Sequence, residues 1–101
     1  MEFYVVLITA PDEQSAREIA MKLVEEDLAK CVNIVKNITS IFTWEGKIET
    51  APEALMIAKT RKDKFQSLMQ RVKELHSYTV AEVIALPIVE GSEAYLSWLR
   101  S

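Results

Sequence analysis

The chain has 101 residues, which predicts one domain over residues 1–101, and half of these residues are hydrophobic. Fifteen acidic and twelve basic residues leave no basic surface to attract a nucleic acid, and two isolated glycines exclude glycine-rich phosphate loops. A single cysteine excludes an intrachain disulfide, and the short apolar runs exclude a signal peptide or membrane span, so we expect a cytoplasmic protein without a membrane partner.

The first quarter of the chain predicts a strand followed by a helix. Residues 3–9 form a continuous β-branched and aromatic run, which is typical of a strand covered on both faces. Asp12 is placed to cap the next helix, because its carboxylate can accept the free N–H groups of the first turn. The apolar positions of this helix recur every three or four residues, at Ala16, Ile19, Ala20, Leu23, Val24 and Leu28.

The middle of the chain predicts a long β-hairpin. Residues 31–44 alternate between apolar and polar side chains and predict one strand. Its apolar side holds Val32, Ile34, Ile38, Phe42 and Trp44. Gly46 supplies the turn over residues 45–47, and residues 48–59 return as the second strand. Pro52 cannot donate a ladder hydrogen bond, so it predicts a bulge or a free edge.

The remaining elements complete a recognisable order. Residues 60–63 match a helix capping box, and the helix that follows is amphipathic through Phe65, Leu68, Met69, Val72 and Leu75. Residues 80–86 predict a final apolar strand, and Gly91 and Ser92 open a short C-terminal helix. The order β-α-β, β-α-β predicts an α+β, ferredoxin-like antiparallel sheet of four strands with two helices on one face.

The predicted hairpin is too long for a compact monomer. A strand of about 14 residues spans roughly 45 Å, whereas a domain of this size has a diameter of roughly 33 Å. The end of the hairpin would therefore project from the body with its apolar residues exposed and its edges unpaired. We expect subunits to cover each other's hairpins, although the residues alone do not set the number of subunits.

Five sequence blocks resemble the CutA divalent-cation tolerance family, in its order and spacing and over nearly the whole chain. These blocks are Thr9-Ala10-Pro11-Asp12, Cys31-Val32-Asn33, Trp44-Glu45-Gly46-Lys47-Ile48-Glu49, Leu75-His76-Ser77-Tyr78 and Tyr95-Leu96-Ser97-Trp98-Leu99, with Lys59-Thr60 between the third and fourth. The resemblance implies a ferredoxin-like homotrimer with interlocking hairpins, a cytoplasmic location and a role in tolerance of copper and other divalent metals. It also implies a trimeric architecture similar to that of the PII signalling proteins, which bind small ligands between subunits.

Two departures from the family pattern bear on metal binding. Ser77 stands where the family usually has proline, which removes a fixed φ from the turn. Family members described as copper-binding carry a cysteine and a second histidine at the positions of Ile8 and Leu75. Of that ligand set only His76 is present, so we expect copper or another divalent metal to bind weakly.

The candidate site residues fall into two groups. The candidate metal ligands are His76, Glu82 and Cys31. Each has a structural alternative: His76 as a helix-end residue near the last carbonyls, Cys31 as a small buried hydrophobe, and Glu82 as a member of an ion pair across an interface. The candidate residues of a small-ligand pocket are Lys59, Arg61, Tyr78 and Trp44.

Three functions compete at this point. The first is a non-catalytic trimer that binds a metal ion or small ligand at subunit interfaces and serves divalent-cation tolerance. The second is a PII-like signalling or anchoring scaffold without metal binding. The third is an enzyme with a site in the cleft between subunits, which the fold does not exclude. We expect no catalytic activity, because no spacing of nucleophile and base stands out and no N-terminal proline is present.

Overall fold

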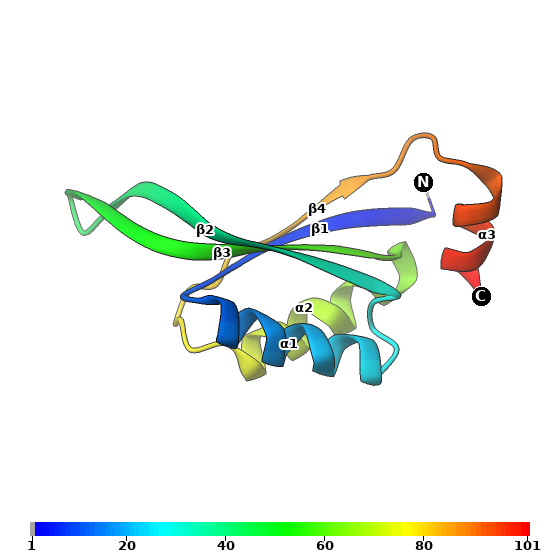
Figure 1. Ribbon diagram of the computed structural model, residues 1–101, viewed down its shortest axis with the longest axis horizontal. Helices are drawn as coiled ribbons and strands as arrows, with labels where there is room; N and C mark the ends of the chain where they lie inside the picture. Colours follow the sequence, from blue (N-terminus) through cyan, green and yellow to red (C-terminus); the bar gives the residue numbers. More distant parts are fainter. Residues whose placement is uncertain (1) are drawn as a thin grey trace.

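The computed structural model describes residues 2–101 as one antiparallel sheet with helices on one of its faces (Figure 1). The strands lie in the order β2-β3-β1-β4, so each β-α-β unit is split by a strand of the other. The elements are β1 (Phe3–Ala10), α1 (Glu13–Glu25), β2 (Cys31–Trp44), β3 (Lys47–Arg61), the single 3-10 turn η1 (Lys62–Lys64), α2 (Phe65–Leu75), β4 (Val83–Pro87) and α3 (Glu93–Arg100). The predicted α+β fold with a four-stranded antiparallel sheet is confirmed.

The core lies between the sheet and helices α1 and α2. It contains Val6 and Ile8 of β1, Leu23 of α1, Met56 of β3 and Leu68 of α2, all with no exposed surface. Burial in β1 alternates, and Val5, Leu7 and Thr9 stay partly exposed on the face that points away from the core. The prediction that this strand is covered on both faces is therefore not met within one chain, because both helices lie on the same side (Figure 1).

The start of α1 follows the sequence prediction, whereas the start of α2 does not. Asp12 caps α1, and its Oδ1 accepts the backbone N–H of Ser15 at 2.7 Å. The capping box predicted at residues 60–63 is wrong, because Thr60 is still part of β3. The hydroxyl of Thr60 instead donates to the carbonyl of Leu28 at 2.7 Å. This bond ties β3 to the loop that follows α1.

The hairpin of β2 and β3 contains a bulge that the alternating pattern did not reveal. Ile34 lies opposite Met56, but Ile38 lies opposite Glu53, so β2 has one extra residue between these pairs. Asn37 adopts a φ of 61° in this bulge, a conformation that asparagine tolerates better than most residues. Directly opposed residues share a face, so Ile34 and Ile38 point to opposite faces. The prediction that one side of β2 holds Val32, Ile34, Ile38, Phe42 and Trp44 together is wrong.

Beyond the bulge the hairpin becomes a two-stranded ribbon. The pairing of β1 with β3 stops at the Ala10–Ala54 pair, whereas β2 and β3 remain paired as far as Trp44 and Lys47. We call residues 38–53 the ribbon. It leaves β3 with a free edge at Pro52, one of the two alternatives expected there. The ribbon projects from the body (Figure 1) and contributes to a long axis of 44 Å, against 25 and 23 Å for the others.

The tip of the ribbon and the start of β4 are both defined by the structure. Glu45 and Gly46 form a two-residue loop with φ values of 51° and 78°, as a tight turn between right-handed twisted strands requires. Strand β4 begins at Val83 rather than at residue 80, so Glu82 lies outside the strand.

None of the helices in residues 2–101 combines the length and the apolar character needed to cross a bilayer.

Candidate functional site

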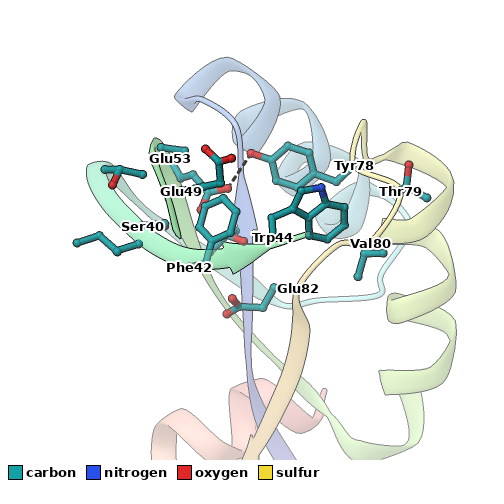
Figure 2. A pocket seen from close by; sticks show the side chains of 13 residues that line it. Ser40, Phe42, Trp44, Glu49, Glu53, Tyr78, Thr79, Val80 and Glu82 are labelled. Atoms are coloured by element: carbon teal, nitrogen blue, oxygen red, sulfur yellow. Dashed lines mark hydrogen bonds between the residues drawn. The ribbon is translucent and has the colours of Figure 1, made fainter. Parts of the chain in front are cut away.

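A cleft of about 720 Å³ lies where the ribbon leaves the sheet, against the segment that follows α2. Its walls come from the end of β1, from both strands of the ribbon and from residues 78–82. Figure 2 shows the side chains that line it. Three aromatic and three acidic side chains dominate the lining: Phe42, Trp44, Tyr78, Glu49, Glu53 and Glu82.

His76 anchors the wall of the cleft to the core. The residue is 8% exposed, and its Nε2 lies 2.7 Å from the carbonyl oxygen of Thr9. Its Nδ1 lies 3.0 Å from the backbone nitrogen of Tyr78. The backbone N–H of Tyr78 can only donate, so Nδ1 accepts and the proton is assigned to Nε2, which donates to Thr9. Both ring nitrogens are therefore occupied, and the imidazole holds the end of α2 against the end of β1.

Tyr78 connects this anchor to the ribbon. Its ring packs against that of His76, with centroids 4.7 Å apart, and its hydroxyl donates to Oε2 of Glu53 at 2.7 Å (Figure 2). Desolvation of the phenol, together with its hydrogen bond to the Glu53 carboxylate, raises the pKa of Tyr78 to about 12. The hydroxyl therefore stays protonated at neutral pH and serves as a hydrogen-bond donor.

Glu53 is the most enclosed carboxylate of the cleft. Its residue is 9% exposed, and the neutral hydroxyl of Tyr78 is its hydrogen-bond partner. Among residues 2–101, no side-chain nitrogen of lysine, arginine or histidine lies within ion-pair distance of it. A buried carboxylate without a cationic partner is energetically unfavourable, so the site has an unused capacity for positive charge.

The predicted pocket residues separate into two places. Trp44 and Tyr78 line the same cleft, as expected for a common pocket. Lys59 and Arg61 lie toward the other end of β3, where Lys59 donates to the side chain of Asn33 and Arg61 pairs with Asp63 through an Nε–Oδ1 distance of 3.0 Å. The six residue-to-residue steps along the strand from Glu53 to Lys59 span roughly 20 Å. One chain therefore does not bring these two cations to the cleft.

The predicted metal ligands are also not brought together. Cys31 lies opposite Lys59, at the far end of β2 from the ribbon, and is half-buried. Glu82 lines the cleft, lies just outside β4 and is exposed in the single chain, so its ion pair across a subunit interface stays a prediction. Within residues 2–101, no three side chains of histidine, cysteine, aspartate or glutamate are grouped so that they could hold a metal ion. The donors of one chain do not fit a copper site.

Sequence reasoning missed Glu49 and Glu53 and treated Phe42 only as an apolar residue of the hairpin. Glu49 and Glu53 belong to β3, whereas the position of Phe42 in the cleft depends on the bulge, which moves the residues of β2 that follow it to the other face of the sheet. Asn37 was the available signal, because asparagine is enriched at positive φ and could have marked the bulge.

Comparison with known proteins agrees with the fold and with the whole length of the chain. Residues 4–101 match the family model described as CutA1 divalent ion tolerance protein. The chain is 55% identical over 96 residues to the divalent-cation tolerance protein CutA of Thermus thermophilus, which covers 95% of this chain and 93% of that protein. It is 48% identical to human protein CutA over 92% of this chain, but it spans about half (52%) of that longer protein, as it does for the plant relatives.

Solved structures give the same result. The Thermus thermophilus protein Cut A1 superposes with a TM-score of 0.94 at 54% identity, covering 96% of this chain and 94% of that one. CutA1 from Oryza sativa superposes with a TM-score of 0.96 at 44% identity, covering 99% and 92%. The chain therefore belongs to the CutA1 divalent ion tolerance family.

Proposed function

We propose that this protein is a homotrimer of divalent-cation tolerance that binds a small ligand or a metal ion in clefts at its subunit interfaces. The ribbon is the observation that carries the proposal. An isolated two-stranded hairpin is marginally stable in water, yet this one exposes Ile41 by 71% and Ile48 by 77%. Another copy of the chain would cover these side chains and pair the free strand edges.

A second apolar surface supports the same assembly. The sheet face opposite α1 and α2 is covered only near Phe3, where α3 packs at the end of the sheet (Figure 1). The rest of this face has no covering element among the described residues, and β4, an edge strand, exposes Ile84 by 51% and Leu86 by 50%. Contiguous exposed apolar surface of this kind marks an interaction site. The subunit number of three comes from the family resemblance and is part of the proposal, as is the cytoplasmic location.

The cleft is the proposed binding site because the ribbon forms one of its walls. A partner that covers the ribbon would lie at the rim of the cleft and could complete it. We propose a binding role without catalysis, since both nitrogens of His76, the one imidazole of the chain, are bonded to backbone groups. Because the donors of one chain do not fit copper, any divalent metal would be weakly bound, with Glu82 the exposed carboxylate available to a site shared between subunits.

Light scattering on the purified protein at micromolar concentration tests the assembly. We expect a particle of three times the 11.5 kDa chain mass. Ile48→Lys should dissociate it, because a charge would replace an apolar side chain in the proposed interface. Met21→Lys on α1 is the matched control: Met21 is also an exposed large hydrophobe, at 61%, but lies on the helical layer. A folded 11.5 kDa species in the parent protein would refute the proposal.

A calorimetric titration tests the ligand. Metal-free protein is titrated with copper and zinc, first as the parent and then as Glu82→Gln. Weak binding that Glu82→Gln removes would support the shared metal site. Binding of either metal with undiminished affinity in this variant would show that the cleft carboxylate is not a ligand. A trimer that binds neither would favour the signalling or anchoring alternative.

A further inference from the structure

The side chains that line the cleft are those expected of a binding site for an organic cation. This inference rests on the proposed binding role of the cleft. Its lining includes the carboxylates of Glu49, Glu53 and Glu82 and, among the described residues, no lysine, arginine or histidine. An anionic ligand would therefore meet repulsion from every ionised group in the wall, whereas a cation would meet attraction.

The aromatic walls specify the kind of cation. Phe42, Trp44 and Tyr78 line the same space as the carboxylates (Figure 2). Aromatic faces attract weakly hydrated cations such as alkylated ammonium groups, and they offer nothing to a small divalent ion that requires oxygen ligands. We propose that the cleft binds a small organic ammonium ion, with its charge toward Glu53 and its alkyl part against the aromatic side chains.

Glu53 is the group expected to select the charge. Tyr78 occupies its Oε2, and no protein group in the part of the chain described bonds to Oε1. Across residues 2–101, no side-chain oxygen or nitrogen is fully buried without a partner, so solvent reaches Oε1. The cleft is the cavity that Glu53 lines. The hydrogen bond from Tyr78 holds the carboxylate in place, which lowers the entropy lost when a ligand binds.

Two ammonium probes and one neutral analogue test the charge requirement. Choline and butylammonium are titrated into the assembled protein at constant ionic strength, beside dimethylbutanol, the uncharged carbon analogue of choline. Fluorescence of Trp44 is followed in a Trp98→Phe background, because Trp98 lies in α3, away from the cleft. We expect at least one ammonium probe to bind about tenfold more tightly than the alcohol, as one charge-assisted contact of roughly 1.4 kcal/mol would give.

Three substitutions locate the site. Glu53→Gln keeps the shape and an acceptor for Tyr78, and should weaken ammonium binding about tenfold while leaving the alcohol unchanged. Trp44→Leu lacks the fluorescent reporter and is followed by calorimetry beside the parent; it should bind the ammonium probes about threefold to fivefold more weakly through loss of the aromatic face. Glu90→Gln is the matched control for net charge, since Glu90 is exposed and does not line the cleft. The affinity of this variant for the ammonium probes should equal that of the parent protein.

The outcomes separate this inference from the proposed function. Equal affinity for the ammonium and the alcohol would overturn it and leave an apolar groove. Binding that neither Glu53→Gln nor Trp44→Leu affects would also overturn it, because the ion would sit elsewhere. If neither ammonium probe binds while light scattering reports an intact trimer, the inference fails and the assembly stands; a lysine or arginine of a neighbouring subunit would then be the group that neutralises Glu53.

Discussion

Replacing Tyr78 by phenylalanine tests whether its hydrogen bond to Glu53 stabilises the fold. The variant removes one hydroxyl and leaves a carboxylate that is 9% exposed without its donor. A hydrogen bond to a charged group contributes about 1.5–3 kcal/mol net. Tyr78 itself is 36% exposed, so water can partly replace the hydroxyl. We therefore expect the lower end of that range, a loss of about 1.5 kcal/mol.

Urea denaturation at one fixed protein concentration is the appropriate assay, because the stability of an oligomer depends on concentration. With an m-value of about 1.5 kcal/mol/M, the midpoint should fall by about 1 M. Tyr4→Phe is the matched control: it removes the same atom from a half-buried tyrosine whose hydroxyl makes no hydrogen bond within residues 2–101, and whose ring packs on Phe65 at 5.7 Å. Equal midpoints for the two variants would refute the reasoning.

The same variant has a defined pH dependence. The pKa of Tyr78 is raised from 10.0 to about 12 in the folded protein, so above pH 10 the unfolded chain loses this proton first. The stabilisation is therefore fully present below pH 10 and is lost as the pH rises to about 12. The stability difference between the parent and Tyr78→Phe should shrink across this interval. A difference that stays constant from neutral pH to pH 12 would contradict the assigned environment of Tyr78.

Two further substitutions test the local structure. Thr60→Val should lower the free energy of unfolding by about 1 kcal/mol, because it removes the hydrogen bond to the Leu28 carbonyl. Circular dichroism should show an unchanged helix content. A loss of helix would instead indicate that Thr60 caps the following helix. Asp12→Ala should destabilise α1 in urea at neutral pH, since it removes the acceptor of the Ser15 N–H. Hydrogen bonds from Ser15 hold the pKa of Asp12 below its usual 3.8, so this difference should persist at pH 5 and disappear as the pH falls below 3.8.

The sequence by itself was sufficient for the fold class. The helical spacing in residues 13–25, the cap at Asp12 and the long alternating run of residues 31–44 each depend on interactions between near neighbours, and the structure has all three. The length of that run also predicted a projecting hairpin, because strand rise and domain diameter are general quantities.

Tertiary structure decided which residues form the candidate site. One extra residue at the bulge reverses the faces of β2 and thereby places Phe42 and Trp44 beside Glu53 and Tyr78. Residue type alone led to the prediction that Lys59 and Tyr78 share a pocket, although the length of β3 between Glu53 and Lys59 keeps Lys59 away from the cleft. His76 illustrates the same limit, because its partner at Nε2 is a carbonyl 67 residues away. Local pattern carries no information about such pairs, since they form only after the strands and helices have packed in one register.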